Sequence, residues 1–173
     1  MKWCWPSNKI NLVAMSAHSE HTGSPDPACA LCRDDGGRVL WTGPRLRVID
    51  AGEPEYPGFT RVIWHAHVAE MTDLARDERE LIMHAVWLVE QAQRDVLRPD
   101  KINLAAFGNY VPHLHWHVIP RWRDDPHFPD AFWSPRRRPP TADAPQGAAR
   151  LARLEAAMPD YRVALATALD ELR

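Results

Sequence analysis

The most informative part of this chain is the stretch VPHLHWHVIPR, which spans residues 111–121. Successive side chains of a β-strand point to opposite faces, so a strand here places His113, His115 and His117 on one face at intervals of about 6.6 Å. The apolar residues between them occupy the other face, where they can pack in a hydrophobic core. The stretch therefore predicts a strand with one titratable face and one buried face.

Three imidazoles in this arrangement indicate a functional site. A single buried histidine is usually structural, but three that alternate with core residues rarely are. A neutral imidazole is a competent nucleophile near pH 7, which favours nucleophilic catalysis. The alternative hypothesis is a metal-dependent hydrolase that uses His113, His115 and His117 as ligands. Such sites need further Asp or His ligands downstream, whereas the residues after His117 are Val-Ile-Pro-Arg.

Around this stretch the chain combines short β-type runs with one long helical pattern. Apolar residues recur at three- and four-residue spacing from Thr72 to Leu97, which predicts a helix with Thr72 as its N-cap and Pro99 beyond its end. A second helical region is expected at residues 147–172, broken near Pro159. The predicted strands are RVLW, RLRVID, TRVIW, INLAAF and HLHWHVIPR. Strands in succession around one long helix predict an α+β domain with an antiparallel sheet.

Composition excludes several classes of protein. The chain has 173 residues, of which 45% are hydrophobic, and a formal net charge of -2. It has no basic stripe and no apolar run near the ~20 residues of a membrane span, so we expect neither nucleic-acid binding nor membrane insertion. Three cysteines are an odd number, and Cys29 and Cys32 form a C-x-x-C pair, which favours a reducing, cytoplasmic compartment. From its spacing, this pair is either a pair of metal ligands or two ordinary thiols.

The segment HLHWHVI resembles the signature of the histidine triad (HIT) family, His-φ-His-φ-His-φ-φ, in which φ is apolar. The resemblance covers the chain from about Cys29 to Trp133. Further landmarks that are similar to HIT proteins are Asn103, Gly108-Asn109, Ile119-Pro120-Arg121, the C-x-x-C pair and the segment VIWHAHVAEMTDL.

This resemblance implies an α+β HIT fold with a five-stranded antiparallel sheet, one long helix and a C-terminal helical region, assembled as a homodimer. We accordingly expect an irregular N-terminal tail at residues 1–27 and a HIT domain at residues 28–134. Residues 135–173 then form a Pro-rich segment and a C-terminal helical extension.

The resemblance also implies a mechanism. In this family the middle histidine, here His115, attacks the α-phosphorus of a nucleotide, and the nucleotidyl-histidine intermediate then passes its nucleotidyl group to water. His117 is expected near the phosphate, and His113 supports the site or binds metal. The implied substrate is a purine nucleotide linked through its α-phosphate to a leaving group, as in a dinucleoside polyphosphate or a nucleoside phosphoramidate. No organic cofactor is implied, and Mg²⁺ is not required.

Three more residues match substrate-contacting positions of the family. Asn103 is expected to orient His115 or the substrate, Asn109 to lie near the bridging or leaving-group oxygen, and Asp50 to hold the ribose hydroxyls. For Asp50 and Asn103, an ordinary strand-end or turn position is an equally good explanation.

One position departs from the family pattern, since Phe59 stands where many members have the histidine of a Pro-Gly-His turn. His65 or His127 could compensate for this loss. A non-catalytic nucleotide-binding module is therefore a second alternative, and it predicts AMP binding without turnover.

The family also suggests partners for the C-x-x-C pair. His67 matches a histidine of zinc-bearing HIT proteins, and His113 matches a zinc ligand in the related galactose-1-phosphate uridylyltransferases. Cys29, Cys32, His67 and His113 are thus expected to form a closed, structural zinc site. The alternative is two packed thiols and a surface histidine.

The residues after the triad leave two interpretations open. They lie near the substrate or a partner subunit, or they form a solvated turn. These residues are Arg121, Arg123, His127 and Trp133.

Overall fold

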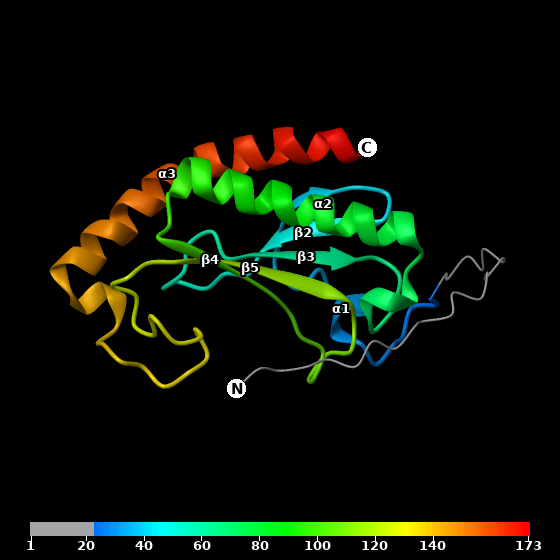
Figure 1. The fold of residues 1–173 in the computed structure, drawn as a ribbon, viewed down its shortest axis with the longest axis horizontal. Coiled ribbons are helices and arrows are strands. Elements are labelled where there is room, and N and C mark those ends of the chain that lie inside the picture. Colours follow the sequence, from blue (N-terminus) through cyan, green and yellow to red (C-terminus); the bar gives the residue numbers. More distant parts are fainter. Residues whose placement is uncertain (1–22) are drawn as a thin grey trace, which may run out of the picture.

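The protein is described by a computed structural model that covers residues 23–173. Its centre is a five-stranded antiparallel sheet in the order β1-β2-β3-β5-β4 (Figure 1). The strands are β1 (Arg38–Thr42), β2 (Leu46–Asp50), β3 (Thr60–Trp64), β4 (Lys101–Ala106) and β5 (His115–Arg121). The predicted α+β class and the five-stranded antiparallel sheet are confirmed. The expected N-terminal tail lies mostly outside the described residues.

The strand that carries the triad begins two residues later than predicted, at His115. His113 lies in a tight turn, where its N–H donates to the carbonyl of Val111 at 2.8 Å. This hydrogen bond between residues i and i+2 closes a turn around Pro112. Because the backbone nitrogen of Pro112 carries no hydrogen, it cannot pair with a neighbouring strand. The first histidine of the triad is therefore held by a turn, and the other two are held by the sheet.

The two faces of the sheet carry different apolar clusters. Val48, Val62 and Val118 belong to the main core, whereas Ile49 and Ile63 pack on the opposite face with Cys29 and Leu31. The alternation expected of strands produces this separation. The main core lies under the two long helices, and the opposite face carries the short helix α1 (Ala30–Arg33), as Figure 1 shows. The triad therefore faces away from the main core.

The long helix is shorter at its start than predicted. It comprises α2 (Arg76–Ala92), continued by one π-helical turn, η2 (Gln93–Leu97). Thr72 is not its N-cap, because Met71–Asp73 form a separate 3-10 turn, η1. The side chain of Glu78 accepts a hydrogen bond from the Ala75 N–H at 3.1 Å and so fixes the start of α2.

The C-terminal region forms one helix, α3 (Pro145–Leu169), and the predicted break at Pro159 is wrong. The helix runs through Pro159 and changes direction along its length, between the orange and red halves in Figure 1. A proline inside a helix removes one hydrogen bond and bends the axis without necessarily ending the helix. Short 3-10 turns, η3 (Thr141–Asp143) and η4 (Asp170–Leu172), flank it.

The helical extension belongs to the main core. Thr60 of β3 is hydrogen-bonded through its hydroxyl to the Tyr161 hydroxyl at 2.8 Å, and the indole of Trp41 in β1 donates to Asp170 at 2.9 Å. The buried residues that α3 adds to the core are Leu154, Met158, Tyr161, Leu165 and Leu169.

No helix in residues 23–173 has the length and apolar character needed to pass through a lipid bilayer.

Candidate active site and metal cluster

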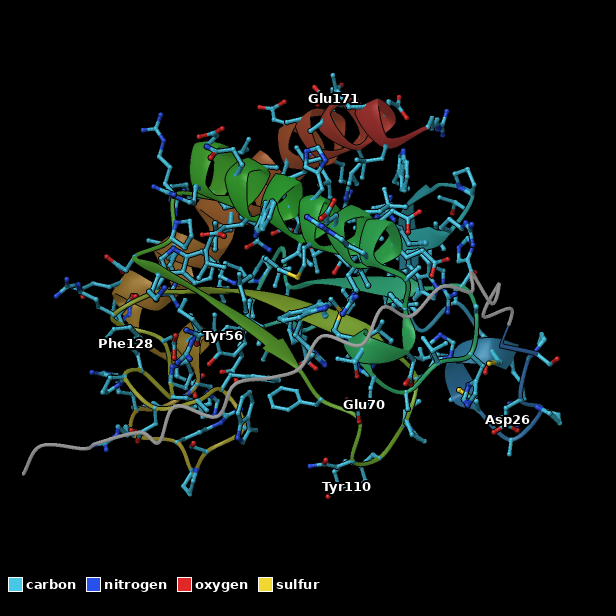
Figure 2. The ribbon with its side chains drawn as sticks, turned by 45° about the vertical axis from the view of Figure 1, so that its right-hand side comes forward. Asp26, Tyr56, Glu70, Tyr110, Phe128 and Glu171 are labelled. Atoms are coloured by element: carbon cyan, nitrogen blue, oxygen red, sulfur yellow. The ribbon has the colours of Figure 1, made fainter. Side chains whose placement is uncertain are left out.

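A cavity of about 580 Å³ opens on the triad face of the sheet. His115 and His117 of β5 and Arg61 of β3 line it together with the loop at residues 107–111 and the aromatic pair Phe132 and Trp133. At the tip of that loop Tyr110 is 99% exposed and projects away from the body of the protein (Figure 2). The site thus combines two histidines and one arginine with largely apolar walls.

His115 is held in one tautomer by the turn that precedes it. Its Nδ1 lies 2.6 Å from the carbonyl oxygen of His113, and because a carbonyl only accepts, Nδ1 carries the proton. The lone pair of the neutral ring is then on Nε2. Burial lowers the pKa of His115 from its ordinary value, and the charge of Arg61 acts in the same direction. His115 is consequently a neutral base with one unprotonated nitrogen beside the cavity.

His117 is also uncharged at neutral pH. Burial, followed by the nearby His115 and Arg61, lowers the pKa of His117 to about 3. Its Nδ1 is buried and has no hydrogen-bond partner among the described residues. The rings of Phe107 and Phe59 lie 5.3 and 5.6 Å from its ring centroid. Phe59 thus gives this side of the site an apolar surface.

The pKa of His117 leads to a prediction about stability. An unfolded histidine has a pKa near 6.5, so between about pH 6.5 and pH 3 the unfolded chain binds a proton that folded His117 does not. This difference makes the free energy of unfolding fall as the pH falls, by about 2 kcal/mol between pH 7.5 and pH 5. In urea unfolding at these two pH values, His117→Gln should lose this part of the pH dependence. His84→Gln, on the exposed side of α2, should keep it. Equal pH dependence in the two variants would contradict the assignment.

Aromatic side chains form one rim of the cavity. The Trp133 ring meets Phe107 edge to face at 4.9 Å and Phe132 at 5.3 Å. Trp133 is 58% exposed and Phe107 is 41% exposed, so both rings present surface to a ligand. Of the two interpretations left open by the sequence, the structure places Trp133 at the cavity.

Arg61 also lines the cavity, although the sequence pattern did not identify it as a candidate site residue. It lies opposite His117 in the β3–β5 pairing, and its guanidinium carbon lies 5.5 Å from the centre of the Phe59 ring. Its Nε is buried without a hydrogen-bond partner in residues 23–173. A charged residue that interrupts the apolar strand TRVIW was the signal that could have revealed it.

The three predicted substrate-contacting residues have different surroundings. Asn109 lines the cavity. Asn103 lies on the triad face, paired with Ile119, but its side-chain oxygen accepts a hydrogen bond from Arg121 at 2.9 Å and is not bonded to His115.

The structure does not bring Asp50 to the histidines, and we exclude it from the candidate site. Its carboxylate accepts the N–H of Gly52 at 3.0 Å and lines a separate cavity beside Glu155 and Arg162, next to α3. The physical reason is strand alternation, because Asp50 follows Ile49, which packs on the triad face, and therefore points the other way.

Arg121 and His127 have structural surroundings. Arg121 is 2% exposed, and its guanidinium donates twice to the carboxylate of Asp125, at 2.7 and 3.0 Å. Although burial acts to raise the pKa of Asp125, the hydrogen bonds from Arg121 and from backbone N–H groups hold it below its ordinary value. His127 Nδ1 lies 2.6 Å from the hydroxyl of Tyr56, which also donates to Asp125 at 3.1 Å.

This buried cluster fixes the loop after β5, near Tyr56 and Phe128 in Figure 2, and that loop carries Trp133 to the cavity. Neither His127 nor His65 lines the cavity, so neither compensates there for Phe59. Arg123 has an exposed side chain.

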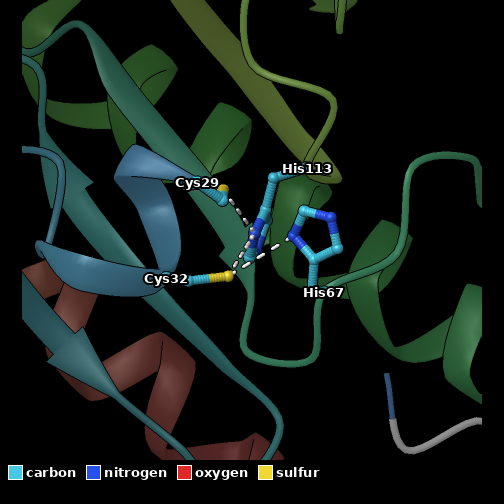
Figure 3. Close-up of side chains that lie close together, drawn as sticks. All are labelled: Cys29, Cys32, His67 and His113. Atoms are coloured by element: carbon cyan, nitrogen blue, oxygen red, sulfur yellow. Dashed lines mark hydrogen bonds between the residues drawn. The ribbon is translucent and has the colours of Figure 1, made fainter. Parts of the chain in front are cut away.

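A second cluster lies beside the triad, where Cys29, Cys32, His67 and His113 converge (Figure 3). Their ligand atoms all lie within 4.8 Å of one another. The Nδ1 of His113 is 3.5 Å from each sulfur, and the Nδ1 of His67 is 3.4 Å from the Cys32 sulfur. A tetrahedral zinc ion with its usual bond lengths separates sulfur and nitrogen ligands by about 3.5 Å. The donor set and its spacing fit such an ion.

The tautomer of His113 agrees with metal binding. Its Nε2 lies 2.7 Å from the carbonyl oxygen of Trp64, so Nε2 carries the proton and the lone pair of Nδ1 points toward the two sulfurs. Arg47 supports the same region, since its guanidinium donates to the backbone carbonyls of Leu31 at 2.7 Å and Asp35 at 3.1 Å. The four predicted ligands are therefore brought together.

The fold is shared with solved structures of histidine triad proteins. A zinc-bound histidine triad family protein from Mycobacterium smegmatis is 24% identical, with a TM-score of 0.55 over 84% of this chain and 98% of that one. A histidine triad protein from Marinobacter aquaeolei is 21% identical, with a TM-score of 0.55 over 73% of this chain and 92% of that one.

Sequence comparison gives the family. An AP-4-A phosphorylase from Mycobacterium tuberculosis is 30% identical over 136 residues, which are 72% of this chain and 70% of that protein. An uncharacterized HIT-like protein from Saccharolobus solfataricus is 26% identical over 107 residues, which are 57% of this chain and 77% of that protein. The family model of the HIT domain matches residues 37–124, which contain the sheet, α2 and the triad. The chain belongs to the HIT family.

Proposed function

We propose that this protein is a nucleotide hydrolase or nucleotidyl transferase that cleaves at the α-phosphate of an AMP-linked substrate through a nucleotidyl-histidine intermediate on His115. One observation carries the proposal. The carbonyl of His113 holds the proton of His115 on Nδ1, which leaves Nε2 unprotonated beside the cavity. Family membership and the similarity to an AP-4-A phosphorylase support a nucleotide-processing enzyme at the family level.

The reaction consists of two displacements at one phosphorus atom. His115 Nε2 forms a bond to the α-phosphorus while the bond from phosphorus to the leaving group breaks. The leaving group takes the electron pair, and an amine leaving group also takes a proton from solvent. An acceptor oxygen, that of water in hydrolysis, then bonds to the phosphorus as the nitrogen–phosphorus bond breaks. The histidine nitrogen takes back the electron pair, and the attacking water releases a proton to solvent. The carbonyl of His113 accepts the Nδ1–H, which stabilises the positive charge that the ring gains in the first step. In keeping with the family, no step is assigned to Mg²⁺ or to an organic cofactor.

The cavity suits a purine nucleotide. The aromatic rim offers stacking surface, and Asn109, which lines the cavity, is proposed to place its amide near the bridging or leaving-group oxygen. The proposed leaving group is a nucleotide, as in dinucleoside polyphosphates, or an amine, as in nucleoside phosphoramidates. His117 is proposed to lie against the phosphate. Asn103 is proposed as a positioning residue, which acts through the hydrogen bond that its side-chain oxygen accepts from Arg121.

We also propose that Cys29, Cys32, His67 and His113 hold a structural Zn²⁺. These four side chains would hold the ion, would link α1 to the turn before β5 through it, and would together supply the four ligands of a closed site. The proposal includes a homodimer and a reducing cytoplasmic compartment, in which both thiols remain available as ligands.

Trapping the intermediate tests the proposed function. The wild-type protein is mixed with adenosine 5′-phosphoramidate and quenched within the first turnover. Intact mass and peptide mapping should show one added nucleotidyl group on the peptide that contains His115. Turnover should persist in a short assay with EDTA, unlike that of a hydrolase using the triad as metal ligands. Nucleotide binding without any adduct or product would identify a non-catalytic binding module instead.

Trp133 gives a further prediction, because its exposed ring is part of the cavity rim. Stacking of a base on an aromatic ring contributes about 1–3 kcal/mol, so Trp133→Ala should raise KM about 10-fold and change kcat little. Trp87→Ala is the matched control, since Trp87 is similarly exposed, at 55%, but lies on α2. Steady-state kinetics with an AMP conjugate measures both variants. A KM unchanged in Trp133→Ala would exclude the rim from substrate binding.

A further inference from the structure

Arg61 is the one ionised side chain among the described residues that line the cavity. Burial lowers its pKa from the ordinary value, yet an arginine remains protonated at neutral pH. The neighbouring His117 is neutral because its pKa is about 3. The positive charge next to the reacting centre therefore comes from Arg61.

The hydrogen-bonding capacity of Arg61 is unused within the described chain. It forms no ion pair with a carboxylate in residues 23–173, and its buried Nε has no partner there. The buried arginines Arg121 and Arg47 differ, since Arg121 is bonded to Asp125 and Asn103, and Arg47 is bonded to backbone carbonyls. Arg61 itself is half-buried, and the charge of Glu53 acts on it without forming an ion pair, so its unpartnered Nε favours a ligand that pairs with it. The position of Arg61 is thus suited to an anion that enters with the substrate.

The two successive displacements at the α-phosphorus indicate where that anion binds. His115 attacks the α-phosphorus from one side, and the leaving group departs from the opposite side. The acceptor of the second step must attack opposite the nitrogen–phosphorus bond, so it enters where the leaving group left. A single cation can therefore bind a phosphate at this place in both steps, and Arg61 lies across from His117 on the neighbouring strand.

We propose that Arg61 binds a phosphate group beyond the attacked α-phosphate and thereby selects substrates with a phosphorylated leaving group. This inference rests on the proposed function and adds a specificity-determining residue to it. The phosphate comes from the leaving polyphosphate or from an inorganic phosphate acceptor. In the second case a phosphate oxygen bonds to the α-phosphorus, the histidine regains its electron pair, and the product is a nucleoside diphosphate. The planar guanidinium matches the oxygens of either group through paired hydrogen bonds.

Two substrates separate this role from a general effect on catalysis. Arg61→Gln should lower kcat/KM for diadenosine tetraphosphate about 100-fold, since hydrogen bonds between charged groups are lost. With an AMP phosphoramidate whose leaving group is an uncharged amine, the change should be about 3-fold or less, because no phosphate pairs with Arg61. Arg61→Lys should recover part of the loss, because it keeps the charge and loses the paired geometry. Arg76→Gln, which removes a positive charge from the surface of α2, is the matched control.

Inorganic phosphate distinguishes the two sources. Phosphate is added to the reaction with the phosphoramidate. If Arg61 also binds the acceptor, the wild-type protein should form nucleoside diphosphate, and Arg61→Gln should lower the ratio of nucleoside diphosphate to AMP about 10-fold or more. A loss confined to diadenosine tetraphosphate assigns Arg61 to the leaving group alone. Equal losses for both substrates, or no loss for either, would overturn the proposal.

A binding measurement keeps this inference separate from the proposed function. If the wild-type protein turns over neither substrate, the proposed function fails, and calorimetry with inorganic tripolyphosphate still tests Arg61. Binding weakened about 10-fold or more in Arg61→Gln supports the phosphate subsite. Equal binding by the wild type and Arg61→Gln, or no binding by the wild type, excludes it.

Discussion

His115→Ala is expected to lower kcat/KM for AMP-linked substrates on the order of 10⁴-fold and to abolish the nucleotidyl adduct. The loss is expected to be large because the His115 Nε2 lone pair is the proposed nucleophile of the first step, and the His113 carbonyl, 2.6 Å from Nδ1, already sets the tautomer of the ring. Steady-state kinetics and intact-mass spectrometry with an AMP phosphoramidate measure the two effects.

Two other variants show whether the effect belongs to the nucleophile. His117→Asn should reduce the rate about 100-fold and still form the adduct, because it removes a neighbour of the phosphate and leaves the attacking nitrogen. His84→Ala, exposed on α2, should behave as the wild type. A His115→Ala protein that stays folded and retains the wild-type rate would rule out His115 as the nucleophile.

The second large effect is expected from the metal cluster. The wild-type protein should contain about one zinc ion per chain, and the double variant Cys29→Ser with Cys32→Ser should contain none. A metal present at about 1,000 times its Kd stabilises the folded state by about 4 kcal/mol. For a chain of this size, the loss should lower Tm by about 10 °C. Elemental analysis and thermal unfolding give the two readouts.

The same effect should appear at a single ligand. His67→Ala should lose zinc and stability, whereas His65→Ala, exposed and outside the cluster, should keep both. Wild-type protein that is purified from zinc-supplemented cells and contains no metal, or ligand variants with unchanged zinc content, would refute the site.

Local pattern predicted the strands well and the ends of the helices less well. The alternation in HLHWHVIPR requires only neighbours along the chain, so β5 and its two faces could be predicted. Thr72 has the chemistry of an N-cap, but the reciprocal bonds of Glu70 and Asp73 form a separate turn there, and α2 begins at Arg76. Pro159 bends α3 without ending it, because Tyr161 and other residues beyond it are held in the core. Packing decided both outcomes.

The candidate site shows the same division. C-x-x-C spacing and resemblance predicted which residues cluster with Cys29, although Cys29 and His113 are separated by 84 positions in the chain. The positions of Arg61 on the triad face and of Asp50 on the opposite face, next to α3, were not foreseen, because each depends on how the strands pair and pack with residues far away in the chain. A change of one residue in strand register reverses every side chain, so such positions need the folded sheet.

The sequence by itself determined the alternation of side chains along β5, the three histidines that this alternation spaces two residues apart, and the thiol pair of Cys29 and Cys32. These follow from the spacing of neighbouring residues. Only the tertiary structure decided that His113 turns its ring to the cysteines while its carbonyl orients His115, and that Arg61 meets His117 across two strands. The physical reason is that strand pairing and burial fix these directions, and both arise from contacts between distant parts of the chain.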